Sequence, residues 1–387
     1  MKVILSLCLI LFAAPGASCQ SDATAFPQIR IKISANQLDN LMLSKGEKMT
    51  LKNPVMMVDQ ETAVVKEVHS RGKSSLTFEH KSLSVELEKA VTITQQGKRV
   101  KIRKFDLMNL VMDKNLWHNR WAFLNMAQLN IFPLFNTYCT VWINDQPQGI
   151  YLLVEKPRHY TAGEAKSPYM IRRGPEHNID DEYIDTEVKD DVKKYKKQFY
   201  SLYEDIRKYK GEVLYERLLA SLYVEHYFDW MAFNYLIMNG DYMDELYLYI
   251  IPETGRFDII PWDYDDILRP APHEGVQERS AIPALKNKLV FSSEDPLDRA
   301  VGSDSYVYSL YEAEFRRLLQ ALPEAQLQAT AAQVLSELES INSDAASVGV
   351  SMFLGKEPFV IDQARKNIAN AVTFVISRRN FLLLDLK

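Results

Sequence analysis

Residues 246–266 read LYLYIIPETGRFDIIPWDYDD, and this stretch decides how the chain is interpreted. Two apolar runs, 246–250 and 257–261, flank the turn-forming residues 252–255, a pattern that predicts a β-hairpin. Asp241 precedes the first run, and Asp263 and Asp265 follow the second. The hairpin is therefore expected to bring three carboxylates to one rim. A hard cation such as Mg²⁺ takes oxygen ligands there, and nucleotide phosphates complete its shell.

Residues in and just before this stretch have structural alternatives. Asp241 follows a long apolar helix, so it could equally serve as a capping or turn residue. The acids after the second run are harder to explain structurally, because uncompensated charge beside an apolar strand is costly. Trp262 is expected to pack in the core in either interpretation.

The N-terminus predicts export. Lys2 precedes the apolar run Val3–Ala14, which is too short to span a bilayer as a stable helix. Residues 1–19 are therefore predicted to be a signal peptide. The small residues before Cys19 allow either lipoprotein processing, with a lipid on Cys19, or ordinary cleavage near Cys19 or Gln20. The protein is expected in the periplasm or at the cell surface, with that lipid as its one expected membrane attachment.

Composition and patterning predict an α+β protein with two lobes. The 387 residues are 47% hydrophobic, enough for two cores, and the net charge of −5 without a large basic tract argues against nucleic acid as a partner. Residues 26–165 are predicted to form a β-rich N-terminal lobe and residues 166–387 a mainly helical C-terminal lobe. Alternating patterns predict strands at 29–33, 83–87, 138–143 and 149–155. Helices are predicted at 118–128, 193–210, 215–239, 306–321, 323–346 and 360–384.

Several segments, in order along the chain, resemble elements of the CotH kinase family, the atypical protein kinases named after a spore-coat protein. A His-Ser-Arg-Gly-Lys-Ser-Ser run and a His-Lys-Ser triplet come first, and an Asn-Gly-Asp triplet and a Pro-Trp-Asp-Tyr-Asp run come late. Each piece alone is weak, whereas the ordered series is more specific. The segments are 69–75, 80–82, 107–120, 143–155, 239–241 and 261–265, with a closing helix around Arg378 and Arg379.

The resemblance implies a divergent protein-kinase-like fold with ATP and Mg²⁺ (or Mn²⁺) as cofactors. Such a site clamps the phosphates, neutralises their charge and orients the acceptor hydroxyl. On this basis Asp241 is the expected catalytic residue that orients the acceptor, and Asp263 and Asp265 are expected metal ligands. Two elements are expected to bind the phosphates. The turn with Gly72, Ser74 and Ser75 would approach them through its backbone N–H groups, and Lys81 would supply a positive charge. Glu155 is the expected partner that holds Lys81.

The chain departs from the family pattern at two positions. Arg172 stands where the family usually has a lysine, and its fork of donors can still clamp phosphate. Glu245, next to Asp244, stands where the family has an asparagine, and it is predicted to be a further metal ligand. By default, Arg172 and Arg120 would be salt-bridge formers.

The predicted function is transfer of the ATP γ-phosphoryl group to Ser or Thr of a protein substrate by an exported atypical protein kinase. Two alternatives remain open. One is a catalytically inactive surface scaffold or adhesion protein, which Glu245 and the missing lysine favour. The other is a phosphotransferase that acts on a small molecule or glycan.

Overall fold

The computed structural model describes residues 26–95, 98–113, 116–175, 178–184, 192–273, 275, 281–347, 353–354 and 357–386. The predicted signal peptide, with Cys19, lies outside these residues. Within the described ranges, no helix combines the length and apolar character needed to cross a membrane.

The N-terminal half is built on an eight-stranded sheet with the order β3-β2-β1-β7-β8-β6-β5-β4. Strands β1 and β7 run parallel, and the other neighbouring strands run antiparallel. The strands predicted at 29–33 and 83–87 and the hairpin predicted between 138 and 155 are confirmed as β1, β5 and β7–β8. The bounds are β1 Gln28–Lys32, β2 Val55–Val58, β3 Glu61–Ala63, β4 Val65–Ser70, β5 Leu83–Gln95, β6 Lys98–Met108, β7 Asn136–Ile143 and β8 Gln146–Glu155.

A second sheet, with the order β10-β9-β11-β12, lies among the C-terminal helices. Its strands are β9 (Tyr169–Arg173), β10 (Ile179–Ile184), β11 (Leu246–Ile250) and β12 (Phe257–Pro261). Strands β11 and β12 pair antiparallel in the predicted hairpin, which is confirmed. A short pair, β13 (Phe353–Leu354) and β14 (Glu357–Pro358), completes the described strands.

Helices dominate the C-terminal half and also border the large sheet. The helices predicted at 118–128, 193–210, 306–321, 323–346 and 360–384 are confirmed within a few residues. The bounds are α1 Ala35–Leu43, α2 His118–Gln128, α3 Pro157–Gly163, α4 Val192–Lys208, α5 Gly211–Ser221, α6 Val224–Ile237, α8 Pro296–Ser303, α9 Ser305–Ala321, α10 Glu324–Ser347 and α11 Ile361–Asp385.

The single helix predicted over 215–239 is wrong, because the chain breaks between α5 and α6. Leu222 forms a parallel bridge with Phe257 of β12, and the Tyr223 N–H donates to the Phe257 carbonyl at 2.8 Å. At these two residues, hydrogen bonds to the sheet interrupt the helix. A new helix, α6, begins at Val224 and ends at Ile237, and most of its residues are buried.

Two hydrophobic cores lie on opposite faces of the large sheet. Successive strand residues point to opposite faces, so Leu107 belongs to the smaller core and Met108 to the larger one. The larger core also takes Trp121 of α2 and Tyr264 after β12. It therefore joins chain segments from both sides of the predicted boundary at residue 166.

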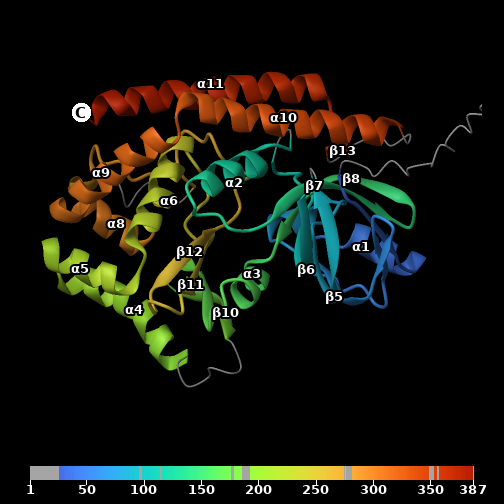
Figure 1. Cartoon of the computed structure of the whole chain (residues 1–387), viewed down its shortest axis with the longest axis horizontal. Coiled ribbons are helices and arrows are strands. Elements are labelled where there is room, and N and C mark those ends of the chain that lie inside the picture. The colour runs from blue at the N-terminus through green and yellow to red at the C-terminus, as the bar shows by residue number, and fades with distance from the viewer. Residues whose placement is uncertain are drawn as a thin grey trace, which may run out of the picture.

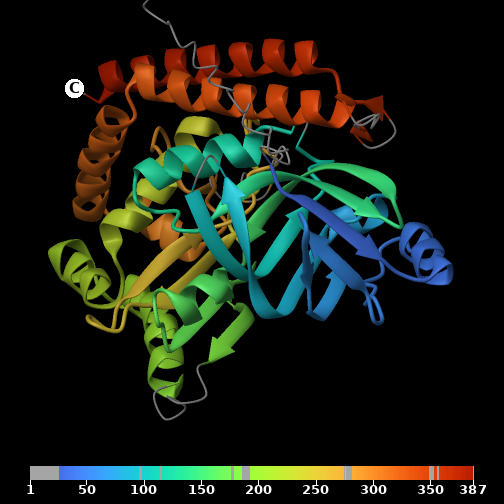
Figure 2. The ribbon, with the colours of Figure 1, turned by 45° about the vertical axis from the view of Figure 1, so that its right-hand side comes forward.

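Helices α10 and α11 run side by side along one edge of the molecule (Figures 1 and 2). Helix α10 extends from the helical half to the large sheet, where it contacts α2 and β7. This arrangement makes α10 a brace between the two halves.

A buried ion pair fixes this brace, and its removal is expected to be costly. Arg120 of α2 donates from Nε and Nη2 to the two carboxylate oxygens of Glu337 on α10, both at 2.8 Å. Its Nη1 donates to the Asn136 carbonyl at 2.9 Å. Arg120→Ala would leave the Glu337 carboxylate buried and unpaired, so we expect a loss of about 3–5 kcal/mol in the free energy of unfolding, measured by urea denaturation.

The control is Arg365→Ala, which removes an exposed pair between Arg365 of α11 and Glu339 of the same helix α10. Because solvent screens that pair, no measurable change in stability is expected. Equal losses from the two substitutions would contradict the bracing role of Arg120.

Candidate active site

The β11–β12 hairpin places Glu245 and Asp263 at the same rim. The register pairs Leu246 with Pro261, and the Trp262 N–H donates to the Glu245 carbonyl at 2.9 Å. The residues just before β11 and just after β12 therefore leave the sheet side by side. Asp263 adopts a φ of +46°, a costly conformation for a residue other than glycine and one that concentrates at functional sites.

The Asp263 carboxylate is close enough to Glu245 and to Asp265 to raise the pKa of each. Burial raises the pKa of Glu245 well above its ordinary value, and the charge of Asp263 raises it further. Burial also raises the pKa of Asp265, and among its neighbours Asp263 contributes most. Asp265 is close enough to Asp263 for its pKa to respond, but the described residues do not place it in a three-residue metal group with Glu245 and Asp263. A cation that binds Glu245 and Asp263 must compete with protons.

Two buried oxygens at this rim have no hydrogen-bond partner, namely Glu245 Oε2 and Asp263 Oδ1. A buried polar atom without a partner costs about 1–3 kcal/mol, and a divalent cation would satisfy both. The described ranges hold no group of three or more His, Cys, Asp or Glu side chains spaced to bind a metal ion. The residues therefore fit a cation held by two protein oxygens, with phosphate and water as the remaining ligands, which is the usual environment of Mg²⁺.

Asp241, the expected catalytic residue, lies beside these acids on the exposed side. Its charge contributes to the raised pKa values of Glu245 and Asp265. Its N–H donates to Asn239 Oδ1 at 3.3 Å. The preceding Gly240 packs so closely on Asp266 that a Cβ atom would lie 2.6 Å from Asp266 Oδ2 and 2.7 Å from Arg269 Cγ, so a side chain at position 240 would push these two side chains aside.

Arg71, directly after β4, is a cation that the N-terminal half places at the site. Its Nε lies 3.1 Å from Asp106 Oδ2, and its guanidinium stacks over the Trp262 ring at 5.7 Å. Burial lowers the pKa of Arg71, but the charges of Asp106 and Asp263 outweigh it and the net shift is upward. Arg71 therefore faces the acid rim with a permanent positive charge.

The expected pair of Lys81 and Glu155 is not formed. Lys81 Nζ donates to the carbonyls of Ser44 at 2.5 Å, Leu76 at 2.7 Å and Phe78. These three bonds use every N–H of the ammonium, so Lys81 has no donor left for a phosphate. Glu155 instead accepts from His159 Nδ1 at 2.5 Å and from the Phe135 N–H at 3.2 Å.

The strand alternation explains why Glu155 points elsewhere. On β6, Asp106 faces the active-site side of the sheet, whereas Phe105 faces the smaller core. Glu155 is registered opposite Phe105, so it lies on the face away from Asp106. In this structure Lys81 and Glu155 therefore hold separate protein groups, and the expected pair between them is absent.

The Gly72 turn does reach the acids. Gly72 has a φ of +100°, and a Cβ atom there would lie 1.9 Å from Ser75 Oγ, so glycine is required. Ser74 begins a short 3-10 turn, Ser74–Thr77, and Ser75 Oγ donates to the Arg71 carbonyl at 3.2 Å. Lys73 Nζ lies 3.2 Å from Asp244 Oδ2, which ties the turn after β4 to the acidic segment before β11.

Arg172 lies at the site as expected, but its guanidinium holds protein groups. Its Nη2 is 2.6 Å from Glu245 Oε1, and its Nε donates to the Asp244 carbonyl at 3.0 Å. The default role of Arg172 as a salt-bridge former is therefore confirmed. Its charge also lowers the pKa of Asp263, against the larger effect of burial.

The start of helix α2 positions the segment 263–265, a role that sequence reasoning missed. The Asp113 carboxylate accepts the N–H groups of Trp117, His118 and Asn119, which fixes the helix start. His118 Nδ1 then donates to the Asp265 carbonyl at 2.8 Å. Asn119 Oδ1 accepts the Tyr264 N–H at 2.8 Å.

Comparison with known proteins assigns the family. The model of the family described as CotH kinase protein matches residues 68–382. The chain belongs to the CotH kinase family. The resemblance predicted from the ordered motifs is thereby confirmed, and the predicted site residues from Gly72 to Asp265 all lie within the matched span.

Other comparisons add little to this CotH family assignment. No curated protein matches the chain. Among solved structures, that of the Helicobacter pylori proinflammatory kinase CtkA matches with a TM-score of 0.35 and 10% identity, over 77% of this chain and 94% of that chain. So low a score does not support a shared fold by itself. The CotH assignment supports a kinase-like function, for which the geometry of the rim must supply the details.

Proposed function

We propose that this protein is an exported CotH-type protein kinase that transfers the γ-phosphoryl group of ATP to Ser or Thr hydroxyls of a protein, with Mg²⁺ or Mn²⁺. The observation that supports this most strongly is the pair of buried, unpartnered oxygens, Glu245 Oε2 and Asp263 Oδ1, at one rim that faces Arg71. In this proposal the sheet-rich and helical halves are the two lobes of a divergent kinase-like fold.

In this proposal the acids bind the cation, and Arg71 and the Gly72 turn bind the phosphates. Glu245 and Asp263 would hold the cation through their unpartnered oxygens. When bound, the cation neutralises phosphate charge and orients the transferred group. Arg71 would contact phosphate oxygens from the opposite side, in the role expected of Lys81, and the Gly72 turn would approach the same phosphates through its backbone.

Asp241 completes the proposed reaction. The acceptor hydroxyl oxygen forms a bond to the γ-phosphorus as the bond from that phosphorus to the β,γ-bridging oxygen breaks, which releases ADP. Asp241 orients the hydroxyl and accepts its proton. The exposed position of Asp241 suits contact with a large acceptor such as a protein.

An inactive scaffold is the second candidate, because Arg172 pairs with Glu245 at 2.6 Å. The pair occupies Oε1 of Glu245, at a position where the family has asparagine. The kinase is expected to bind nucleotide together with a divalent cation, whereas the scaffold is expected to bind no nucleotide at this site.

Thermal unfolding with a non-hydrolysable ATP analogue tests the proposal. Stabilisation that requires Mg²⁺ or Mn²⁺ supports the kinase, because a ligand that binds the folded state raises the melting temperature. No stabilisation under any condition supports the scaffold. Labelled ATP offered separately to protein and glycan acceptors then distinguishes a protein kinase from a glycan phosphotransferase.

Export is proposed from the N-terminal sequence, with or without a lipid on Cys19. The mass of the mature N-terminal peptide tests it. A diacylglyceryl mass on Cys19 would establish the anchored form, whereas a peptide that begins near Cys19 or Gln20 without this mass would establish plain secretion, and an intact Met1 would contradict export.

A further inference from the structure

Two consecutive arginines of β9 bind two consecutive carbonyls of the acidic segment 241–245. Arg172 Nε donates to the Asp244 carbonyl at 3.0 Å, and Arg173 Nε donates to the Met243 carbonyl at 2.8 Å. Neighbouring side chains of a strand point to opposite faces. Arg172 therefore lies at the acid rim, and Arg173 holds the same segment from behind.

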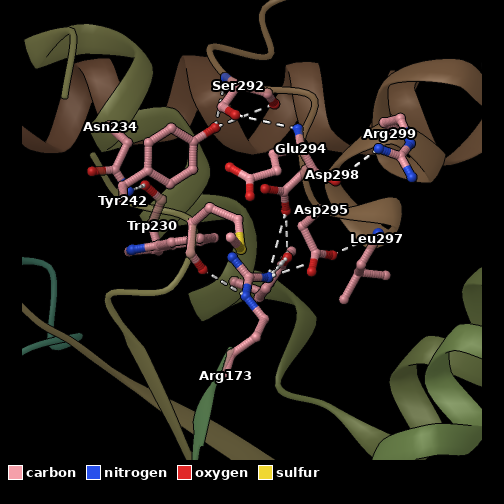
Figure 3. Close-up of polar contacts among 12 residues, drawn as sticks. Arg173, Trp230, Asn234, Tyr242, Ser292, Glu294, Asp295, Leu297, Asp298 and Arg299 are labelled. Carbon is pink, nitrogen blue, oxygen red and sulfur yellow. Dashed lines mark hydrogen bonds and ion pairs between the residues drawn. The ribbon is translucent and has the colours of Figure 1, made fainter. Parts of the chain in front are cut away.

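The Arg173 guanidinium is buried in a polar cluster beneath the segment (Figure 3). Its Nη1 donates to the Tyr227 hydroxyl at 2.8 Å. The same nitrogen lies 3.6 Å from Asp295 Oδ1 and 3.9 Å from Asp298 Oδ1. The guanidinium also stacks over the Trp230 ring at 5.1 Å.

Both acids belong to the start of helix α8. Asp295 caps the helix by accepting the Leu297 N–H at 2.7 Å, and Asp298 lies in the first turn. The side chains of Asp295 and Asp298 are fully buried, and that of Arg173 is 1% exposed. Helix α8 therefore anchors the guanidinium, and the guanidinium anchors the acidic segment.

Stability alone does not account for such a cluster. Burying an arginine with two carboxylates costs desolvation energy that the pairing barely offsets, and apolar residues of similar volume are often equally stable or better. The cluster also leaves Arg173 Nη2 and Asp298 Oδ2 buried without hydrogen-bond partners. Buried charge of this kind is best attested where it fixes one specific geometry.

The geometry fixed here is that of the segment between Asp241 and Glu245. Met243 lies two residues from each, so its carbonyl is the central point of the segment. Tyr242 provides a second anchor, because its hydroxyl accepts the Ser292 N–H at 2.8 Å, next to the start of α8 (Figure 3). Both anchors come from the side of the segment opposite the acid rim.

We propose that Arg173, with Asp295 and Asp298 behind it, is a positioning residue that holds Asp241 and Glu245 in register with Asp263 through the Met243 carbonyl. This inference rests on the proposed kinase function for its effect on turnover. Its effect on the segment itself does not depend on that function, since a backbone anchor acts whether or not the site is catalytic.

Arg173→Lys tests the proposal with two readouts. Lysine keeps the charge but not the fork, so it cannot bind Met243 and both acids together. We expect backbone hydrogen exchange in peptides that cover residues 241–246 to accelerate at least about tenfold. We also expect kcat to fall about 10–100-fold with less than about a threefold change in KM for ATP, because a 1 Å misplacement of reacting groups lowers the rate by about this much.

Arg379→Met is the matched control, because Arg379 Nε also donates to backbone carbonyls, those of Leu319 at 2.9 Å and Leu322 at 2.7 Å, but on α11 away from the site. It is expected to change neither readout. Tyr227→Phe provides a milder variant that removes one bond to the guanidinium, and we expect a smaller acceleration of exchange in the same peptides.

The outcomes separate this inference from the proposed function. Unchanged exchange in residues 241–246 of Arg173→Lys, or equal acceleration in Arg379→Met, would overturn the positioning role. Accelerated exchange in a protein whose parent shows no metal-dependent nucleotide binding would retain the anchor and reject the kinase function. Accelerated exchange with unchanged kcat would overturn the link between the anchor and catalysis.

Discussion

Asp263→Asn is expected to abolish phosphoryl transfer and, at the same time, to make the metal-free protein more stable. Asparagine keeps an oxygen at this position but loses the negative charge that holds the cation, whose contribution to transition-state stabilisation is several kcal/mol, so the rate should fall at least about 10²–10³-fold. Asparagine tolerates the positive φ at this position. It also removes the charge that raises the pKa values of Glu245 and Asp265, so the fold should gain stability. Labelled-ATP transfer and urea unfolding with a chelator measure the two effects.

The raised pKa values of these acids also predict how the free energy of unfolding changes with pH. Carboxyl groups with raised pKa values keep protons in the folded state that they release on unfolding, so the stability they provide is lost as pH rises from about 4 through their folded pKa values. The metal-free parent should lose about 1.4 kcal/mol per pH unit for each such group in this window, and Asp263→Asn should lose less. Excess Mg²⁺ should restore the parent at high pH, since metal binding favours the deprotonated acids.

Asp258→Asn is the control for this experiment. Asp258 lies on β12, five residues before Asp263, and pairs with His226 Nδ1 at 2.7 Å. This substitution removes an acid of the same hairpin without touching the rim, and transfer activity should persist. An Asp263→Asn protein that retains activity, or that unfolds more easily than the parent without metal, would contradict the assignment of Asp263.

The second large effect is an expected contrast between Arg71→Met and Lys81→Met. Arg71→Met removes the cation that faces Asp263, so kcat/KM for ATP should fall about 10²-fold or more. Lys81→Met leaves the buried Leu76 carbonyl and the partly buried carbonyls of Ser44 and Phe78 without this donor, and should lower the free energy of unfolding by about 1–3 kcal/mol. Activity per folded molecule should survive in Lys81→Met, because its ammonium does not face the site.

Urea unfolding and steady-state kinetics, performed at a temperature where both variants are folded, measure this contrast. Arg71→Lys is the conservative control, and it should recover part of the loss because it restores the charge without the fork. A folded, inactive Lys81→Met protein beside an active Arg71→Met protein would return the phosphate-binding role to Lys81.

Local patterns predicted the acidic hairpin and most of the helices. Two apolar runs on either side of a Pro-Glu-Thr-Gly turn predict β11 and β12, and the register of these strands brings Glu245 and Asp263 together. The break between α5 and α6 could not be predicted in this way, because it depends on a backbone bridge from Leu222 to Phe257. Non-local pairing overrides helix propensity at that point.

The site cations show the limit of sequence reasoning more clearly. In the sequence, Arg71 and Lys81 flank the same small-residue turn, and both residue types bind phosphate in other proteins. What separates them is the carbonyl of Ser44, just past the end of α1, which helps to occupy Lys81. The face on which Glu155 lies follows from the pairing of β6 with β8. Glu155 is opposite Phe105, and Asp106, the next residue of β6, points to the other face. The sequence alone does not show that these two strands pair.

A crystal structure with Mn²⁺ and a non-hydrolysable ATP analogue, with the ion located by its anomalous signal, tests the central claim most directly. The account predicts an Mn²⁺ peak bound by Glu245 and Asp263, with the terminal phosphates between that ion and the Arg71 guanidinium. Nucleotide and metal bound elsewhere, or phosphates held by Lys81 with Glu245 and Asp263 unliganded, would contradict it.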